Sequence, residues 1–375
     1  MEETTGRDST IHLVGDVGPC RHDPDTMFDR VRPTLAGSDL NICQLEPVLS
    51  KRGSPLPQAR LAMRSDPAAA RAIRNAGFRC VSFASNHCMD WGSEAFFDTI
   101  DALRAAGLTP IGVGANAQEA RKPALFDRGG TRVAVLAYNS ILPTGYWAEA
   151  GRPGCTPLRA WTFYEQIEHD QPGTPPRIHT SAHRGDLEAM CEDIRRAKES
   201  AHVVIVMMHW GIHFVPAVLA EYQRGIAHAA IEAGADLIAG HHPHLLKGVE
   251  VYRGKVVLYS LGNFALDLPT AFQEGVLQSD GFRDIRALNP RFNTGSRSFL
   301  PPETRRTMVA RCSIRGRSIQ DVSVLPAYIN EQAEPEILDS TDVRFREVLQ
   351  YLEAITASEG LNAKFQPEDS AIRIQ

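Results

Sequence analysis

The sequence contains no hydrophobic run long enough to cross a lipid bilayer. Its longest aliphatic run is VVIVMM, at 203–208, whereas a membrane-spanning helix needs about 20 apolar residues. Residues 1–10, MEETTGRDST, also lack the basic start and the apolar stretch of a signal peptide. We therefore expect a cytoplasmic protein with no membrane partner, and we expect residues 1–10 to form a flexible N-terminus.

Paired cysteines and runs of basic residues are also absent. The seven cysteines are an odd number without C-x-x-C spacing, so they cannot close a complete disulfide framework. We expect them to be reduced, small core residues. The 40 Lys and Arg residues and 45 Asp and Glu residues give a formal net charge of -5, and no basic run resembles a nucleic-acid footprint. Nucleic acid is therefore a poor candidate partner.

Short β-rich runs alternate with amphipathic helical patterns from residue 11 to about 265. Hydrophobic residues make up 43% of the chain and charged residues 23%, which leaves enough apolar material for a substantial core. Strands are predicted at 11–16, 39–46, 80–85, 109–113, 132–138, 203–208, 236–240 and 256–260, and helices at 66–77, 92–107, 184–200 and 216–234. The alternation predicts an α/β layered domain in which helices flank the sheets.

Two segments interrupt this alternation. Residues 141–185 are rich in Pro, Gly and aromatic residues, and 268–305 is a long irregular segment with several arginines; loops of this length are usually functional or disordered. A C-terminal β/α extension is predicted from strands at 307–316 and 318–329 and a helix at 342–358. We therefore expect one domain over 11–330 with these two insertions, followed by a C-terminal helix and a loosely held tail over 331–375.

Polar side chains able to bind a metal ion fall at the ends of the predicted strands. They are Asp16, Glu46, Asn86 with His87, His209, and His242 with His244. In open α/β sheets, sites form outside the carboxyl ends of the strands. Carboxylate, amide and imidazole groups together suit divalent metals. We expect a site for a divalent ion, and this ligand mixture admits Mn, Zn, Mg, Fe or Ca.

Several short motifs follow one another in a familiar order. They are GD at 15–16, NICQLEP at 41–47, SNHCMDWG at 85–92, MHWG at 208–211, GHHPH at 240–244 and YSLGNF at 259–264. On these motifs the chain resembles the CapA family, named for poly-γ-glutamate capsule synthesis, over about residues 11–267. The resemblance implies the layered sandwich of a calcineurin-like metallophosphoesterase, a fold that does not by itself fix the function.

The resemblance also implies roles for individual residues. One metal site would use Glu46 as a bridging carboxylate, together with Asn86, His209 and His242. A second site would use Asp16 and His244. His87 resembles the acid that protonates the leaving group in phosphoesterases. Asn263 would position a ligand or the substrate, or simply form a turn, and His241 would be a structural ring.

Two departures from the family pattern change what the resemblance implies. Metallophosphoesterases usually carry a histidine two residues after the first aspartate, where this chain has Gly18. The second metal site is short of a ligand, so we expect one bound ion. In HWGIHF, His213 replaces the glutamate of capsule-type relatives, and we expect no membrane anchor of the kind that capsule synthesis proteins carry. Both observations argue against a function in capsule polymerisation.

A single metal ion beside a free aspartate and histidine favours proton chemistry. If Asp16 and His244 hold no second ion, they become opposed acid and base groups that remove a proton from one face of a carbon and return it to the other. One soluble branch of the family is similar to this picture and epimerises the C-terminal residue of a lasso-type ribosomal peptide. A peptide partner is then expected, with its terminal carboxylate on the metal. The expected substrate-binding residues are Trp147, Trp161, His213 and Asn263, although ordinary packing under a long loop is the alternative for the tryptophans.

Two other functions stay open from the sequence. The first is a metal-dependent hydrolase of a phosphoester or a γ-glutamyl amide, with His87 as the acid, although Gly18 counts against a two-metal reaction. The second is a non-catalytic metal-binding scaffold in a biosynthetic complex. In a scaffold, loss of Asp16 or His244 would leave function intact. The sequence does not determine the oligomeric state.

Overall fold

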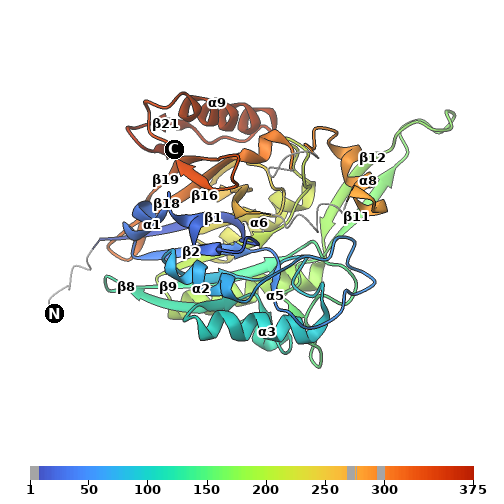
Figure 1. The fold of residues 1–375 in the computed structure, drawn as a ribbon. Helices are drawn as coiled ribbons and strands as arrows, with labels where there is room; N and C mark the ends of the chain where they lie inside the picture. The colour runs from blue at the N-terminus through green and yellow to red at the C-terminus, as the bar shows by residue number, and fades with distance from the viewer. Residues whose placement is uncertain (1–7, 268–274, 276, 294–299) are drawn as a thin grey trace.

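Two large β-sheets pack face to face, and helices cover their outer faces (Figure 1). The computed structural model describes residues 8–267, 275, 277–293 and 300–375. One continuous apolar core lies between the sheets and extends beneath the helices of the first sheet. The α/β layered sandwich predicted from the sequence is therefore confirmed.

The first sheet has the N-terminal strand β1 near its middle. In spatial order its strands are β21 (Phe365–Pro367), β22 (Ile372–Ile374), β19 (Ser318–Ile329), β18 (Arg306–Arg315), β1 (Ser9–Gly18), β2 (Leu40–Leu45), β5 (Phe78–Ser82) and β6 (Thr109–Ile111), while β17 (Asn263–Leu266) pairs with β1 and β20 (Pro335–Ile337) with β19. β1, β2 and β5 run parallel to one another. Their carboxyl ends therefore meet at one edge of the sheet.

The second sheet is buried on both faces. Its strands, in spatial order, are β15 (Val249–Tyr252), β16 (Lys255–Leu258), β14 (Leu237–His241), β13 (Val203–His209), β9 (Thr131–Asn139) and β8 (Ala124–Arg128). In β13, Ile205 and Met207 belong to the core between the sheets, while Val204 and Val206 face the helices outside. Burial on both faces explains why this strand is a continuous apolar run instead of an alternating one.

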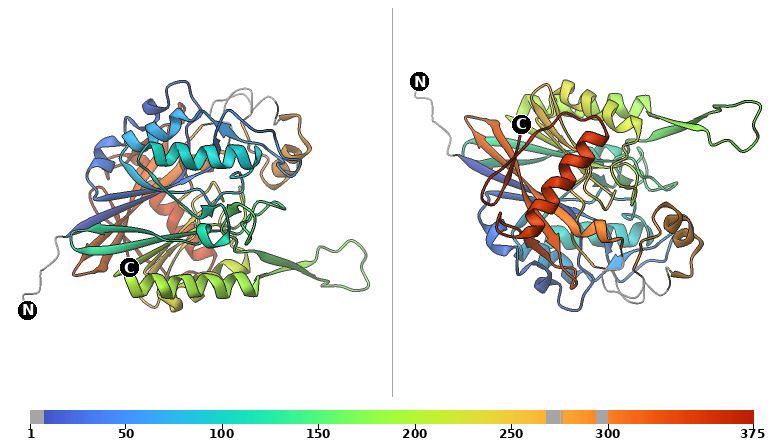
Figure 2. Two further views of the ribbon diagram at one scale, coloured as in Figure 1. Left: turned by 90° about the horizontal axis from the view of Figure 1, so that it is seen from below. Right: turned by 90° about the horizontal axis from the view of Figure 1, so that it is seen from above.

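The helices form the outer layers, which Figure 2 shows from two further sides. α2 (Ala68–Asn75) and α3 (Gly92–Ala105) pack against the first sheet, and α5 (Arg184–Ser200) and α6 (Glu221–Ala233) against the second. The shorter elements are η1 (Pro24–Phe28), α1 (Arg32–Ala36), β3 (Val48–Leu49), β4 (Arg64–Ser65), β7 (Val113–Gly114), α4 (Ala117–Ala120), β10 (Gly154–Cys155), β11 (Ala160–Glu165), β12 (Arg177–Ala182), α8 (Asp280–Leu288) and η2 (Pro302–Arg305). No described helix combines the length and the apolar character that a bilayer crossing needs.

Two predicted elements differ in their bounds for local reasons. The strand predicted at 109–113 is divided between β6 and β7 by Gly112, whose φ of +74° is one that side-chain-bearing residues rarely adopt. The helix predicted from 216 begins only at Glu221. The preceding loop is held by the buried ammonium of Lys247, which donates to the carbonyls of Val215 and Val218.

The C-terminal segment differs from the loose tail that we expected. After α9 (Val343–Ser358), strands β21 and β22 pair with each other, and β22 also pairs with β19. Ala371 and Ile372 are 2% and 0% exposed. The expectation of a loosely held tail is wrong because the apolar residues of this short strand are buried at the end of the first sheet.

Candidate metal centre

The strand ends bring carboxylate, amide and imidazole groups into one cluster. The contributing residues are Asp16 of β1, Glu46 after β2, Asn86 and His87 after β5, His209 at the end of β13, and His242 and His244 after β14. Asp16 and Glu46 are both 0% exposed. The structure therefore brings together every residue for which the sequence predicted a metal or acid–base role.

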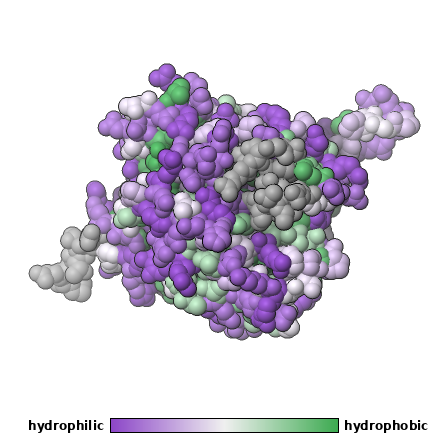
Figure 3. Space-filling view, viewed as in Figure 1, coloured by the Kyte–Doolittle hydropathy of each residue, from purple (hydrophilic) through white to green (hydrophobic). Residues whose placement is uncertain are grey.

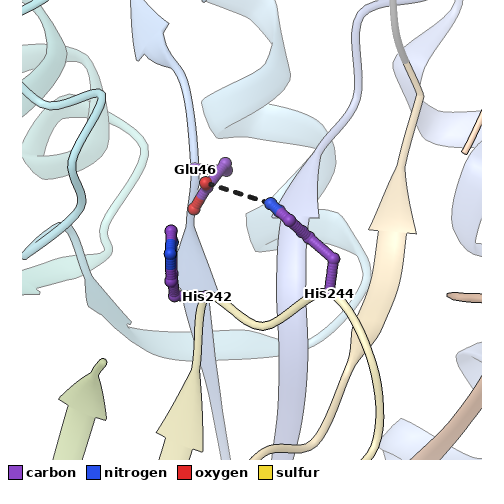
Figure 4. Close-up of side chains that lie close together, drawn as sticks. All are labelled: Glu46, His242 and His244. Atoms are coloured by element: carbon purple, nitrogen blue, oxygen red, sulfur yellow. Dashed lines mark ion pairs between the residues drawn. The ribbon is translucent and has the colours of Figure 1, made fainter. Parts of the chain in front are cut away.

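Glu46 occupies the centre of this cluster. Its Oε2 lies 3.9 Å from Nε2 of His209, and its Oε1 lies 3.9 Å from Nε2 of His244. Oδ1 of Asn86 is 2.7 Å from Nε2 of His209. Figure 4 shows Glu46 facing both His242 and His244. Two groups of ligand atoms close enough to hold an ion share this carboxylate: Glu46 with His242 and His244, and Glu46 with Asp16 and His209.

Several buried polar atoms of the cluster have no hydrogen-bond partner among the described residues. They are Oδ1 of Asp16, Oε1 of Glu46, Nδ1 of His209 and Nδ1 of His242. An unsatisfied buried polar atom costs about 1–3 kcal/mol, and more when it is charged. Carboxylate oxygens and imidazole nitrogens are the donors that divalent transition metals bind, and in His209 the nitrogen that faces Glu46 is Nε2. The residues present therefore fit a divalent cation.

The charges of the cluster follow from burial and from close pairing. Burial raises the pKa of Glu46, and with the charge of Asp16 it brings that pKa to about 7. Burial lowers the pKa of His209 to about 3 and that of His242 well below its usual value. These two imidazoles are thus neutral at physiological pH, which is the form that binds a metal ion.

Asp16 and His244 form an ion pair beside Glu46. Oδ2 of Asp16 lies 3.4 Å from Nδ1 of His244. Burial lowers the pKa of His244, but the contact with Asp16 outweighs burial and raises that pKa to about 9. For Asp16, burial acts to raise the pKa, but the contact with His244 outweighs burial and lowers that pKa below its usual value. A carboxylate and an imidazolium therefore face each other.

The turn that carries the two histidines has an unusual backbone. His242 and His244 have φ values of 90° and 56°, in a region that non-glycine residues enter only at a cost of about 1–3 kcal/mol. Phe214, with φ of 59°, donates its backbone N–H to the carbonyl of Pro243. The surrounding structure therefore holds both imidazoles in a strained turn, as is common at functional sites.

His87 is oriented by two residues that the sequence did not suggest. Its Nδ1 lies 2.6 Å from Oδ2 of Asp90, and the hydroxyl of Tyr146 donates to Oδ1 of the same carboxylate at 2.9 Å. Nε2 of His87 lies 3.8 Å from Oε1 of Glu46. Asp90 thus directs the second ring nitrogen of His87 toward the cluster. The only available signal was that Asp90 lies three residues after His87 in SNHCMDWG.

An apolar cavity of about 460 Å³ opens beside the cluster. Its apolar wall is formed by Leu61, Phe214, Phe282, Ile285, Phe292 and Leu300. The ring of Phe214 stacks on that of His244, with centroids 5.1 Å apart. His213 lines the same cavity, as predicted for a substrate-binding residue, and its ring centroid is 5.3 Å from that of His242. Among the described lining residues, Arg60 is the only lysine or arginine.

Other residues predicted near the substrate lie elsewhere or have another contact. Trp161 is 52% exposed on β11, and Trp147 lines a separate small cavity with its indole N–H donated to Glu149. The prediction that these tryptophans line the pocket beside the metal ligands is corrected, because the start of their segment reaches the cavity through Ile141 and Pro143, whereas Trp147 faces a separate cavity and Trp161 lies on the exposed strand β11. Oδ1 of Asn263 lies 2.8 Å from Nδ1 of His244, so Asn263 contacts the histidine and not the cavity. His241 contacts the carbonyl of Val14, as expected of a structural ring.

Together, the two packed sheets and the cluster at their strand ends define an α/β layered sandwich with a candidate metal centre. The family model described as "Bacterial capsule synthesis protein PGA_cap" matches residues 6–268. The chain therefore belongs to this capsule synthesis family, and the resemblance to CapA is confirmed at the level of the family.

Two curated relatives agree with this assignment. The chain is 28% identical to the PGA biosynthesis protein CapA of Bacillus subtilis over 65% of this chain and 57% of the relative. It is 29% identical to the capsule biosynthesis protein CapA of Bacillus anthracis over 69% and 60% of the two chains. The matches thus span less than two thirds of these relatives. A putative 5'-nucleotidase of Staphylococcus aureus, solved with alpha-ketoglutarate, aligns at 14% identity and a TM-score of 0.41 over 92% of this chain and 58% of that one.

Proposed function

We propose that this protein is a metal-dependent peptide epimerase that exchanges the α-proton of a C-terminal residue, in a peptide of the ribosomal lasso type. The observation that carries the proposal is the buried pair of Asp16 and His244, whose facing atoms are 3.4 Å apart beside Glu46. A carboxylate and an imidazolium in contact are a base and an acid that share one proton. The fold alone would not distinguish this chemistry from others.

The pair supports proton exchange in either direction. In one direction the Asp16 carboxylate would accept the α-proton from one face of the carbon, and Nε2 of His244, the ring nitrogen that faces Glu46 and not Asp16, would give a proton to the opposite face. For this step the substrate carbon enters between the two side chains and replaces their 3.4 Å contact. The carbon–hydrogen bond that breaks is replaced by one of opposite configuration, and the pair ends with a protonated Asp16 and a neutral His244. The reverse reaction starts from that state. No oxidant or other co-reactant is needed.

The remaining ligands support a single metal ion. Glu46, Asn86, His209 and His242 would hold it: Glu46 belongs to both candidate groups of ligand atoms, one with His242 and one with His209, and Asn86 contacts His209. The same two groups also contain His244 and Asp16, which the proposal assigns to proton transfer. A divalent cation supplies Lewis acidity toward a substrate carboxylate or carbonyl, which makes the neighbouring α-carbon more acidic. The residues of the chain orient the substrate around it and move the proton.

The cavity supports a peptide with an apolar terminal side chain. The ring of Phe292 contacts those of Phe214 and Phe282 beside it, with centroids 5.0 and 5.3 Å apart. Phosphoester sites usually present several cations to the phosphate, whereas Arg60 is the only lysine or arginine among the described lining residues and is itself paired with Asp284. An apolar side chain therefore suits the cavity better than a phosphate group.

One observation favours a hydrolase as the second candidate. His87, oriented by Asp90, directs its Nε2 to within 3.8 Å of Glu46. A histidine so placed could protonate a departing amine or alkoxide, as expected for cleavage of a γ-glutamyl amide or a phosphoester. Hydrolysis splits the substrate, whereas proton exchange leaves it intact, so one experiment separates the two functions.

The test is incubation in deuterated water with synthetic peptides that end in Trp, Phe, Leu or Asp. We expect one added deuterium on the terminal residue, together with appearance of its D-form, for the apolar termini and not for Asp. Mass spectrometry and chiral amino-acid analysis measure both. Cleavage of the peptide without deuterium at the α-carbon would contradict the epimerase and support the hydrolase.

A further inference from the structure

Lys247 is buried inside the molecule. Figure 3 shows one face of the protein covered mostly by hydrophilic residues, where lysines normally lie, whereas Lys247 is 0% exposed. It is the only buried lysine or arginine in the described part of the chain. Burial lowers the pKa of Lys247 to about 7, although the charge of Glu359 acts in the opposite direction. A buried ammonium group destabilises the fold unless it is hydrogen-bonded. Its partners both lie in residues 211–219, the connecting loop between β13 and α6.

The connecting loop has an unfavourable backbone at two places. Phe214 and Ala217 both have φ of 59°, in the left-handed region that non-glycine residues rarely adopt. Such a conformation persists only where the surrounding structure holds it. Nζ of Lys247 donates to the carbonyl of Val215 and, at 2.8 Å, to that of Val218. The two carbonyls belong to the residues directly after the two strained ones, so Lys247 holds the loop at both places.

The connecting loop also carries the ring that covers His244. Phe214 stacks on the imidazole with centroids 5.1 Å apart and ring planes at 19°. Nδ1 of His244 contacts Asp16 and Asn263, while Nε2 faces Glu46, as Figure 4 shows. Polar contacts therefore fix one edge of the imidazole, and Phe214 covers one of its faces. The direction of Nε2 thus depends on where the connecting loop places Phe214.

Other contacts of the loop act on Phe214 itself. Its N–H donates to the carbonyl of Pro243 at 3.0 Å, and its carbonyl accepts from Nδ2 of Asn289 at 3.0 Å. These bonds fix one strained residue, whereas the ammonium of Lys247 joins both strained places through a single group. Loss of Lys247 would therefore free the part of the loop that follows Phe214.

We propose that Lys247 is a positioning residue, whose buried ammonium fixes the connecting loop so that Phe214 holds the ring of His244 with Nε2 directed toward the substrate. Lys247 itself is not among the described residues that line the cavity. The effect on proton exchange rests on the proposed function, because His244 is the proposed acid. Without the ammonium the strained residues relax, Phe214 leaves the imidazole, and His244 loses the orientation that proton transfer needs.

A double-mutant cycle tests whether Lys247 acts through Phe214. Lys247→Met keeps a side chain of similar length without donors, and Phe214→Leu removes the ring. Each should lower kcat for exchange on a Phe-terminated peptide by roughly 10- to 100-fold. KM should change much less, because Phe282 and Phe292 still form the wall of the cavity. The double variant should be hardly slower than either single one, since both remove the same contact.

Two outcomes of the cycle would overturn the proposal. The first is a double variant whose loss is the product of the two single losses, because Lys247 would then act independently of Phe214. The second is full kcat in Phe214→Leu, which counts against the proposal even if Lys247→Met does not fold.

Lys198→Met is the matched control. Nζ of Lys198 donates to the carbonyl of His202 at 2.7 Å and to Asp236, next to the amino ends of β13 and β14. Its replacement removes a similar set of bonds away from the connecting loop. We expect Lys198→Met to unfold at a lower urea concentration with unchanged kcat. A loss of kcat equal to that of Lys247→Met would assign Lys247 a merely structural role and overturn the proposal.

Nuclear magnetic resonance tests the position of the ring without relying on activity. The protein is labelled with ¹³C at the histidine Cε1 atoms and loaded with Zn²⁺, and the His244 signal is assigned by its absence in His244→Gln. The stacked ring of Phe214 should shift the Hε1 signal of His244 upfield in the wild type. The signal should move downfield in Lys247→Met and in Phe214→Leu but not in Lys198→Met, and an unmoved signal in Lys247→Met would overturn the proposal. If the signal moves while the wild type exchanges no proton, the positioning role stands and the proposed function fails.

Discussion

Replacing Asp16 by Asn is expected to reduce α-proton exchange by about a thousandfold, within the range of general acid–base catalysis. The amide keeps the shape of the side chain but cannot accept the proton. His244→Gln should cause a loss of similar size, because the two groups share one proton at 3.4 Å. The double variant should lose little more than either single one, since residues that act as a unit are not additive. Deuterium incorporation into a Phe-terminated peptide measures all three.

Measuring the metal content of Asp16→Asn shows whether exchange is lost because the proton acceptor is missing or because the ion no longer binds. Asp16→Asn should retain about one ion per chain by elemental analysis, because the expected ligands are Glu46, Asn86, His209 and His242. A matched control is Asp66→Asn, which removes a carboxyl paired with Lys51 at the surface and should leave exchange unchanged. Full exchange activity of Asp16→Asn would contradict the role of Asp16 as the proton acceptor, whereas absence of exchange in the wild type would support the scaffold function.

Replacing Glu46 by Gln is expected to lower metal affinity by at least roughly 100-fold, more than loss of an outer-shell partner does. Glu46 belongs to both candidate groups of metal ligands, so its loss removes the charge at their centre. Calorimetric titration with Mn²⁺ or Zn²⁺ measures the change. Affinity of the wild type should also fall as the pH drops below about 7, where Glu46 without an ion takes up a proton.

The same substitution should have the opposite effect on the metal-free fold. Burial and Asp16 raise the pKa of Glu46 from 4.5 to about 7, so its ionised form costs the folded state stability. That cost begins as the pH rises above 4.5 and is complete above about 7, reaching up to about 3 kcal/mol. With chelator at pH 8, Glu46→Gln should therefore unfold at a higher urea concentration than the wild type. A variant that is less stable and still binds metal would contradict this account of Glu46.

The sequence predicted the layers and the cluster because both depend on local patterns. Parallel strands such as VVIVMM are continuous apolar runs, and polar residues directly after such strands, such as Glu46 in the first sheet and His242 in the second, lie at the carboxyl edge of their sheet. The motifs around these residues also led to the family. The positions of the strands and the end of the sheet that carries the site are thus largely encoded in short segments of the chain.

The walls of the site could not be predicted in the same way. The apolar cavity joins Leu61, Phe214 and Phe282, which are far apart in the sequence and share no periodic pattern. We predicted instead that the tryptophans of the aromatic-rich insertion contact the substrate. Trp161, however, lies on a projecting hairpin, and no local sequence pattern shows that it is exposed. The shape of the cavity and the exposure of Trp161 both depend on long-range packing between irregular segments.

The central claim is that one metal ion lies beside a free acid–base pair, and anomalous diffraction from crystals grown with excess Mn²⁺ or Zn²⁺ tests it most directly. The account predicts one fully occupied peak, bound by Glu46, Asn86, His209 and His242, with Asp16 and His244 still facing each other. Two fully occupied peaks, one of them bound by Asp16 and His244, would leave no free pair for proton exchange and would contradict the account.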